Sequence, residues 1–360
     1  MTELEGKKEN IRIGITQGDI NSIGYEIIIK TFMDERMLES TTPIIFGSSK
    51  AASYHRKALN INTFNLNLVK GAQHAVAHHA NIVNIIDKEV KIELGKSTST
   101  GGELAYMSLE AAVDALKKGH IDVLVTAPIN KNNIQSDKFS FPGHTEYLAE
   151  LFGEHDDLML MIGNEIRIGV ITGHIPLRQI PETITEDLIL RKIRILHKSL
   201  VRDFAIEKPK IALLGMNPHA GDEGLIGEEE KNTIIPAINK ANEEDILTFG
   251  PYPADGLFGT PNYRKFDGIL AMYHDQGMLP FKALAFNSGV NYTAGLPIIR
   301  TSPAHGTAYE IAGKGLASPE SFREAVYLAC DIYRNRTEYD KLKQNAFVPA
   351  GEKSRQTGQE

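Results

Sequence analysis

Three histidines each follow a short apolar run of the kind that forms a buried strand. The runs span 166–172, 210–216 and 268–273, and they lead to His174, His219 and His274, respectively. In an open α/β sheet, ligands bind outside the carboxyl ends of the strands. Three imidazoles delivered there predict a catalytic metal site whose fourth position is open to water or substrate. The alternative for each histidine alone is a loop residue that hydrogen-bonds to its neighbours.

A second group of residues has the chemistry of an anion site. Lys282, Asn291 and Arg300 follow one another at nine-residue intervals. A guanidinium grips phosphate or carboxylate in two places, whereas an ammonium acts as a mobile point charge. Upstream, a Pro-Gly turn places His144 and Thr145 at the start of a predicted helix, and a helix N-terminus attracts anions. The alternatives are solvated surface charges and a simple helix cap.

Two aspartates are candidates for proton transfer. Asp275 directly follows His274, and Asp255 lies in a Pro-Ala-Asp-Gly segment. Either carboxylate could orient an imidazole or act as a general base. For Asp255, an ordinary turn-forming role is the alternative.

A nucleotide site of a common type is not predicted. The sequence has neither a G-x-G-x-x-G motif after a strand nor a G-x-x-x-x-G-K-[ST] loop. The remaining candidate is the glycine-rich segment 305–315, whose small residues would let the backbone approach a ligand closely. A glycine-rich turn that only joins two elements is the alternative.

The elements that must position these groups alternate along the chain. Apolar runs at 11–16 and 123–129 read as buried strands, and apolar residues at helical spacing predict helices over 104–118 and 185–200. Gly119 is a good C-terminal stop for the first of these helices, and Thr185 is of the residue type that caps the start of the second. Strands that alternate with helices predict an α/β fold with a mostly parallel sheet.

Composition narrows the function classes. The chain has 360 residues, 42% hydrophobic and 24% charged, which suits a globular protein of two lobes. A net charge of −7 without a basic block argues against nucleic acid as a partner. The polar start has no signal-peptide pattern, and no apolar stretch is long enough to cross a membrane. Cys330 lies in an apolar helical pattern and is expected to be buried. We therefore expect a cytoplasmic protein.

Nine ordered motifs between about Ile11 and Leu328 resemble those of the 4-hydroxythreonine-4-phosphate dehydrogenases, the NAD-dependent enzymes of pyridoxal phosphate biosynthesis. The motifs are TQGDINSIGYE (16–26), TAPINK (126–131), FPGHTE (141–146), TGHIPL (172–177), NPHAGDEGLIGEEE (217–230), PADGLF (253–258), YHDQGMLPFK (273–282), VNYTAGLPIIRTS (290–302) and HGTAYEIAGKG (305–315). The last motif also resembles the cofactor loop of isopropylmalate and isocitrate dehydrogenases.

This resemblance implies an isopropylmalate dehydrogenase-like fold. Two α/β/α lobes with mostly parallel sheets would flank an active-site cleft. One lobe would comprise 1–137 and 307–349, the central metal- and substrate-binding lobe would comprise 138–306, and 350–360 would form a frayed tail.

The resemblance also implies roles for the residues above. The metal ligands would be His174, His219 and His274, with zinc as the first choice and magnesium or cobalt as alternatives. The phosphorylated substrate would contact His144, Thr145, Lys282, Asn291 and Arg300. The cofactor, NAD or NADP, would contact His305, Gly306, Thr307, Ala308, Ile311 and Gly313. The protein would be a homodimer with the active site at the subunit interface and the metal shared between subunits.

The implied reaction oxidises 4-phosphooxy-L-threonine to 2-amino-3-oxo-4-phosphooxybutanoate, which loses CO₂ to give 3-amino-2-oxopropyl phosphate. Alternatives are oxidation of a related acid such as 4-phosphoerythronate, a metal-dependent phosphatase or hydrolase, and a metabolite-binding protein without catalysis. Two departures bear on this choice. The first motif lacks the prolines of the usual GDPAGIGPE, and Ala304 stands where the family commonly has an acid before HGTA.

Overall fold

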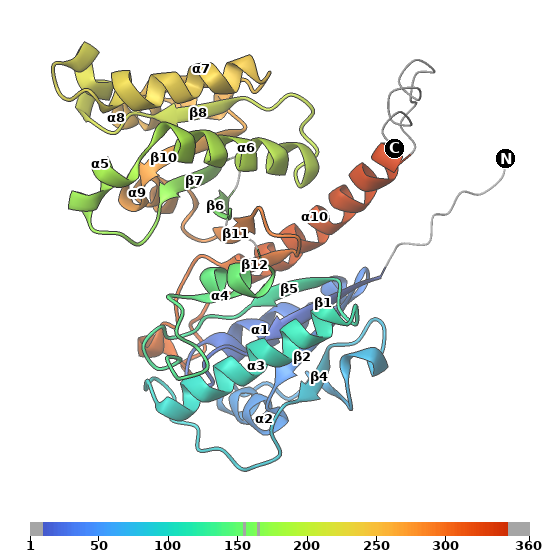
Figure 1. The fold of residues 1–360 in the computed structure, drawn as a ribbon. Coiled ribbons are helices and arrows are strands. Elements are labelled where there is room, and N and C mark those ends of the chain that lie inside the picture. Colours follow the sequence, from blue (N-terminus) through green and yellow to red (C-terminus); the bar gives the residue numbers. More distant parts are fainter. Residues whose placement is uncertain (1–9, 154–155, 164–165, 345–360) are drawn as a thin grey trace.

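A computed structural model describes residues 10–153, 156–163 and 166–344 (Figure 1). The predicted tail, 350–360, lies outside these residues, as do 1–9 and 345–349 of the predicted first lobe.

Within the described residues, the strands form one twelve-stranded sheet with the order β3-β4-β2-β1-β5-β12-β11-β6-β7-β10-β8-β9. The strands are β1 Ile11–Thr16, β2 Thr41–Gly47, β3 Asn67–Val69, β4 Asn81–Asn84, β5 Val123–Thr126, β6 Leu158–Gly163, β7 Ile166–Thr172, β8 Ile211–Leu214, β9 Thr248–Tyr252, β10 Gly268–Tyr273, β11 Val290–Ala294 and β12 Arg300–Pro303.

Strand direction divides this sheet into two parallel halves. Strands β3, β4, β2, β1, β5 and β12 pair in parallel, and so do β7, β10, β8 and β9. Between them, β11 is antiparallel to β12 and β6, and β6 is antiparallel to β7. The two halves therefore run in opposite directions and meet at a short antiparallel centre. The predicted α/β fold with a mostly parallel sheet is confirmed.

Helices cover both parts of the sheet. They are α1 Gly24–Phe32, α2 Ser49–Ala58, α3 Ser99–Lys117, α4 His144–Leu151, α5 Ile180–Thr183, α6 Glu186–Arg202, α7 Ile235–Glu243, α8 Ala254–Phe258, α9 His274–Ala285 and α10 Glu320–Gln344. Figure 1 shows α1 to α3 around the first half and α5 to α9 around the second, with β11, β12 and α10 between them. No helix among the described residues is long and apolar enough to span a membrane.

The predicted strands form because their side chains are covered on both faces. Strands β5 and β8 are buried at every position, as near-continuous apolar runs of parallel sheets are. The runs at 11–16, 166–172 and 268–273 become strands with the predicted ends. The run at 123–129 ends earlier, at Thr126, and Pro128 has no N–H to continue the ladder.

Helix α6 begins as predicted, with Thr185 as its cap. The hydroxyl of Thr185 accepts a hydrogen bond from the backbone N–H of Leu188 at 3.2 Å. One face of the helix packs into the core through Ile189, Ile193 and Leu196. The cap satisfies a backbone donor that has no partner within the helix.

Thr185→Ala is therefore expected to lower the free energy of unfolding by about 1 kcal/mol, the usual effect of losing such a cap. Urea unfolding followed by circular dichroism measures the change. Thr185→Ser is the matched control because it keeps the hydroxyl, and it should stay close to wild type. An equal loss in both variants would contradict the capping role.

A buried network fixes the central strand β11 from behind. The carboxylate of Asp203, at the end of α6, accepts hydrogen bonds from Tyr292 of β11 at 2.6 Å and from Arg336 of α10 at 2.7 Å. Arg336 also donates to the Tyr292 hydroxyl at 2.9 Å. All three side chains are buried. A fully paired network of this kind holds its elements in one arrangement, and Asn291 is the neighbour of Tyr292 in β11.

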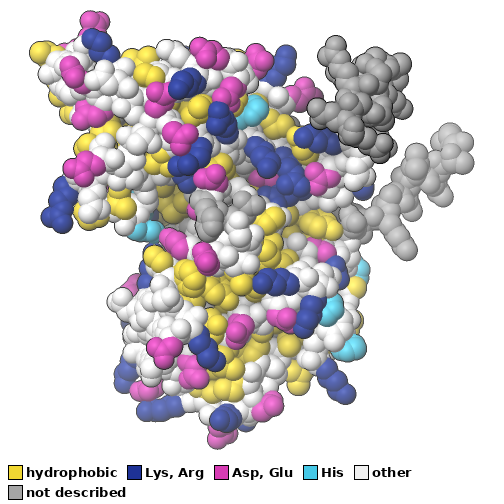
Figure 2. Space-filling view, viewed as in Figure 1, with side chains coloured by type: hydrophobic (Ala, Val, Ile, Leu, Met, Phe, Trp, Pro, Cys, Tyr) yellow, Lys and Arg dark blue, Asp and Glu magenta, His cyan; other side chains and the backbone are white. Residues whose placement is uncertain are grey.

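The hydrophobic core does not divide cleanly at the predicted lobe boundary. Tyr147 and Leu148 of α4 lie in one cluster with Leu109 of α3 and Leu124 of β5, so α4 packs on the first half of the sheet. A boundary at residue 138 stays a prediction. Cys330 is buried in α10, as expected. Figure 2 shows acidic and basic side chains interspersed on the face it displays.

Candidate active site

A cavity of about 400 Å³ lies over the centre of the sheet, where the two parallel halves meet. Its walls come from β6, β7, β11 and β12, from the loop after β5 and from the start of α4. This volume is in the range of small-ligand sites. The predicted site residues that line it are His144, Thr145, His174, Asn291 and Arg300.

Arg300 is the buried cation of this cavity. Its side chain starts β12, and the residue is only 4% exposed. Its Nε and Nη2 atoms donate to the hydroxyl of Thr126 at 3.1 and 2.7 Å, and Nη2 also donates to Nδ1 of His144 at 3.1 Å. Burial lowers the pKa of Arg300 to about 10, so the guanidinium stays charged at neutral pH. These partners fix its orientation without neutralising it, which suits an anionic ligand.

His144 is a neutral hydrogen-bond donor. Because arginine can only donate, Nδ1 of His144 is the acceptor and the ring proton resides on Nε2. Burial, together with the charges of Arg300 and Lys131, lowers the pKa of His144 well below its usual range. Its Nε2 is buried and has no partner within the described chain, and the same holds for Oδ1 of Asn291. A buried polar atom without a partner costs free energy, so the N–H of His144 and the amide oxygen of Asn291 are expected to hydrogen-bond to a ligand or to water.

The lowered pKa of His144 gives a testable pH dependence. The unfolded chain, with a histidine pKa near 6.5, binds a proton that the folded protein excludes. Stability therefore falls as the pH drops through this range. His144→Asn keeps an acceptor for Arg300 but cannot titrate, so its melting temperature should fall less than that of wild type between pH 7.5 and 5.5. His79→Asn, at an exposed site, is the control and should behave as wild type. Parallel curves for His144→Asn and wild type would contradict this account.

His174 and His274 lie together. Strands β7 and β10 are adjacent and parallel, with Thr172 paired to Tyr273, so both histidines leave the sheet at the same end. Their ring centroids are 5.6 Å apart. This proximity follows from the strand order, as expected for residues that follow neighbouring parallel strands.

Each of these imidazoles has a carboxylate near Nδ1. Oδ1 of Asp275 lies 2.8 Å from Nδ1 of His274, and Oε1 of Glu146 lies 3.9 Å from Nδ1 of His174. A carboxylate on Nδ1 orients the ring and leaves Nε2 available as a metal ligand. Asp275 therefore has the geometry of an orienting carboxylate, one of the two roles expected for it.

His219 is not part of this pair. Strand β8 is parallel to β10, but His219 comes five residues after Leu214, is exposed, and lines a separate cavity. Within residues 10–153, 156–163 and 166–344, no three His, Cys, Asp or Glu side chains are arranged to bind one metal ion. The three-histidine site stays a prediction, and one chain supplies two of its members together.

Two other predicted residues also lie apart from the cavity. Lys282 is exposed on α9, two turns beyond His274, and Asp255 is exposed in the first turn of α8. Neither lines the cavity that contains Arg300. In a single chain, the structure thus gathers part of the predicted site and leaves these side chains open to solvent.

The predicted cofactor loop packs against the first motif of the chain. The carbonyl of Thr307 accepts a hydrogen bond from the N–H of Ile23 at 3.2 Å, and the hydroxyl of Tyr309 donates to Oδ2 of Asp19 at 2.7 Å. Asp19 follows β1, and Asn133, which follows β5, donates to the same oxygen. The loop therefore lies beside the carboxyl ends of two parallel strands, where nucleotides bind in such sheets.

The predicted cofactor residues have an irregular backbone. Ala308 has φ 43° and Gly313 has φ 73°, and a Cβ on Gly313 would lie 2.4 Å from Cδ1 of Leu94, which would have to shift. Burial lowers the pKa of His305, and its Nε2 has no partner within the described residues. Gly306, also in this loop, is exposed. A buried nitrogen without a partner beside an exposed glycine is compatible with a bound ligand.

Sequence reasoning missed four charged residues of the cavity, namely Lys131, Glu146, Asp157 and Lys192. Lys131 comes two positions after the predicted strand at 123–129, and Glu146 lies in the first helical turn with His144, so both had a signal of position. Lys192 had none, because it lies within an ordinary amphipathic helix. It donates to the carbonyl of Asp157, and burial lowers the pKa of Lys192.

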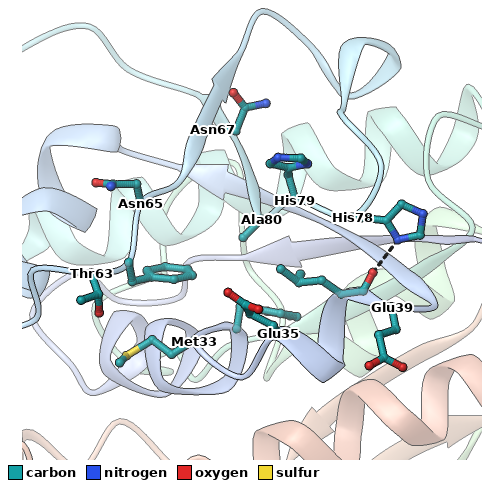
Figure 3. A pocket seen from close by; sticks show the side chains of 12 residues that line it. Met33, Glu35, Glu39, Thr63, Asn65, Asn67, His78, His79 and Ala80 are labelled. Atoms are coloured by element: carbon teal, nitrogen blue, oxygen red, sulfur yellow. Dashed lines mark hydrogen bonds between the residues drawn. The ribbon is translucent and has the colours of Figure 1, made fainter.

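A larger cavity, of about 650 Å³, lies elsewhere, beside β3 and η1 (Glu35–Leu38). Figure 3 shows His78 hydrogen-bonded to a backbone carbonyl, while Glu35 and Glu39 point in other directions. His78 and His79 are both exposed. None of the predicted site residues lines this cavity, and its size alone is no reason to assign it a function.

Known proteins are similar to this chain over most of its length. Residues 39–329 match the family model described as pyridoxal phosphate biosynthetic protein PdxA. A protein of Bacteroides thetaiotaomicron named 4-hydroxythreonine-4-phosphate dehydrogenase is 56% identical over 92% of this chain and 91% of its own length.

Two further comparisons refine this similarity. A protein of Oceanobacillus iheyensis named putative D-threonate 4-phosphate dehydrogenase is 38% identical over 89% of this chain and 97% of its own. A crystal structure of 4-hydroxythreonine-4-phosphate dehydrogenase from Klebsiella pneumoniae superposes with a TM-score of 0.76 and 32% identity, over 90% of this chain and 100% of that one. Both the sequence and the fold are therefore shared along most of the chain.

Proposed function

This chain belongs to the family of the pyridoxal phosphate biosynthetic protein PdxA, and we propose that it is a 4-hydroxythreonine-4-phosphate dehydrogenase. In this proposal it oxidises 4-phosphooxy-L-threonine to 2-amino-3-oxo-4-phosphooxybutanoate, which then loses CO₂ to give 3-amino-2-oxopropyl phosphate. NAD or NADP is the oxidant, and a divalent metal ion assists.

The observation that carries this proposal is the buried guanidinium of Arg300 in a cavity of ligand size. Arg300 and the N–H of His144 offer donors to a phosphate, and Asn291 lies on the same wall. A phosphate remote from the reacting carbon supplies binding energy and orientation. The exposed amine of Lys282 would add a second cation if another copy of the chain brought it to this cavity.

One chain supplies two of the three protein ligands that a catalytic metal ion needs. His174 and His274 lie close together, and a carboxylate near each Nδ1 leaves each Nε2 available. A catalytic zinc site uses three protein ligands, so a third must come from elsewhere. In a homodimer that shares the site, the exposed His219 of a second copy would be this third ligand. When bound, the cofactor accepts a hydride from the alcohol carbon, and zinc, magnesium or cobalt stabilises the negative charge on its oxygen.

A related substrate is the second candidate. One relative is named for D-threonate 4-phosphate, and 4-phosphoerythronate is a similar acid with a hydroxyl in place of the amine. Ala304 distinguishes this chain from the common family pattern beside the cofactor loop.

One set of assays separates these possibilities. The purified protein is mixed with a divalent metal, NAD or NADP, and either 4-phosphooxy-L-threonine or a phosphorylated hydroxy acid, and the absorbance of reduced cofactor is followed. The highest kcat/KM is expected for the amino acid substrate. Release of inorganic phosphate without reduced cofactor would indicate a hydrolase, and ligand binding without either product would indicate a binding protein.

Metal removal is expected to abolish this activity. Dialysis against a chelator should stop formation of reduced cofactor, because the substrate oxygen then has no cation to stabilise its negative charge. Addition of zinc, cobalt or magnesium should restore the activity. A buffer exchange without chelator is the control. Full turnover by the chelated protein, with metal content verified by mass spectrometry, would show that the metal assignment is wrong.

A further inference from the structure

The loop that carries His219 is a left-handed turn. Its consecutive residues all have positive φ: His219 53°, Ala220 52°, Gly221 80°, Asp222 43°, Glu223 56° and Gly224 96°. Single residues other than glycine visit this region, but successive ones are disfavoured because each Cβ approaches the next carbonyl oxygen. Such strain persists only where the surrounding structure fixes it. The proposed function uses His219 of this motif and leaves the shape of the turn unexplained.

One buried carboxylate holds the start of this turn. Oε1 of Glu230 accepts hydrogen bonds from the backbone N–H groups of Met216 and Asn217, each at 2.7 Å. Oε2 accepts from the side-chain amide of Asn217 at 2.9 Å. Glu230 is 3% exposed and begins a π-helical turn, Glu230–Ile234. π-turns of this kind often occur at functional sites.

The turn packs tightly on that carboxylate. A Cβ on Gly221 would lie 2.6 Å from Oε2 of Glu230, and a Cβ on Gly215 would lie 2.8 Å from Cα of Ala220. Real Cβ atoms do not approach so closely, so the backbone fits against Glu230 only with glycine at these positions. By contrast, a Cβ on Gly224 would meet nothing within 4 Å.

The same loop is tied to the neighbouring histidine. Nε2 of Gln276 donates to the carbonyl of Gly215 at 2.6 Å, and its Oε1 accepts from the N–H of Met272 at 2.7 Å. Gln276 lies in the first turn of α9, two residues after His274. The beginning of the His219 loop is therefore fixed relative to the end of β10, from which His274 follows.

We infer that Glu230 is a positioning residue, which holds residues 216–224 in the left-handed turn and thereby fixes the exposed position of His219. As far as it concerns metal binding, this inference rests on the proposed function. His219 is exposed and lines a cavity of about 520 Å³ with Asp222 and Glu223, and neither His174 nor His274 lines that cavity. If His219 binds a metal ion together with residues of a second copy, its own loop must hold the imidazole in place before the two copies associate.

The test compares Glu230→Gln with Glu228→Gln. The first substitution keeps the size of the side chain but turns one acceptor into an amide that faces the donating amide of Asn217. Glu228 is exposed on the same segment, and its carboxylate accepts a hydrogen bond from the side chain of Asn232, which lies outside the turn. Glu228→Gln therefore removes the same charge but keeps the contacts that hold the turn. Both full-length variants are examined by amide hydrogen exchange over residues 215–227 and by titration of the metal-free protein with Co²⁺.

In Glu230→Gln, the backbone amide hydrogens of Met216 and Asn217 should exchange with solvent faster than in wild type. This variant should also bind Co²⁺ about 10- to 100-fold more weakly, the range seen when a residue that orients a metal ligand is lost. Saturating Co²⁺ should restore most of the turnover, which a general loss of folding would not allow. Glu228→Gln should match wild type in exchange and in affinity. Unchanged exchange in Glu230→Gln would overturn the inference, and faster exchange with unchanged affinity would overturn the positioning of His219.

A second pair of variants tests the turn if Glu230→Gln folds poorly. Gly221→Ala and Gly224→Ala both place a side chain at positive φ, but only the first collides with Glu230. Gly221→Ala should weaken Co²⁺ binding more than Gly224→Ala does, and equal effects would count against the role of Glu230. If wild type itself binds no Co²⁺, the proposed function loses its metal, whereas the exchange data still decide whether Glu230 holds the loop.

Discussion

Arg300→Ala is expected to lower kcat/KM by about 100- to 1,000-fold, which corresponds to roughly 3–4 kcal/mol of lost binding to an anionic group in a buried site. The effect is large because the guanidinium is only 4% exposed and its partners, Thr126 and His144, leave its charge for the ligand. Arg300→Lys keeps the charge but loses the forked geometry, so a loss of at least about tenfold is expected.

Three comparisons make this prediction specific. Thr126→Val removes the hydroxyl that holds Arg300 and should raise KM while the charge remains. Arg334→Lys, on the exposed side of α10, is the matched control and should leave both constants unchanged. Melting temperatures of all variants separate lost binding from lost folding. Wild-type kcat and KM in Arg300→Ala would remove this residue from the site.

Subunit mixing should restore activity to a pair of inactive variants. Since one chain brings His174 and His274 together, the proposed third ligand, His219, belongs to the other chain. His174→Ala and His219→Ala should each be nearly inactive, because a catalytic metal site needs all three protein ligands. In their heterodimer, one site has all three histidines and the other lacks two. A random mixture contains about half heterodimers, so about a quarter of the wild-type rate is expected.

The control for this experiment comes from the same geometry. His174→Ala mixed with His274→Ala should regain no activity, because each site of that heterodimer lacks one ligand. Subunit exchange is verified by native mass spectrometry with a mass-tagged chain. Recovery in the control mixture but not with His219→Ala would show that His174 and His274 act from opposite subunits. Exchange without recovery in either mixture would argue that each site is built within one chain.

The amino-acid sequence by itself determined the elements and where chemistry could be placed. Apolar runs such as 166–172 and 268–273 became strands because both of their faces are covered, which is a local requirement that a sequence can display. The cap at Thr185 is also a local feature, because its hydroxyl bonds to a backbone N–H only three residues later. Residues that come one or two positions after a strand, such as His174 and His274, were therefore placed at one end of the sheet.

Only the tertiary structure decided which of these groups meet. The pairing of β12 with β5 brings Arg300 to Thr126, 174 positions away, and the hydrogen bond that Arg300 donates to Nδ1 fixes the tautomer of His144. Lys192 enters the cavity from the middle of a helix, where periodicity shows only an amphipathic pattern. His219 lies apart from His174 and His274, in a loop whose left-handed turn follows residues hydrogen-bonded to the carboxylate of Glu230, eleven positions later. Strand order, burial and loop handedness depend on contacts between distant segments, and no local pattern encodes them.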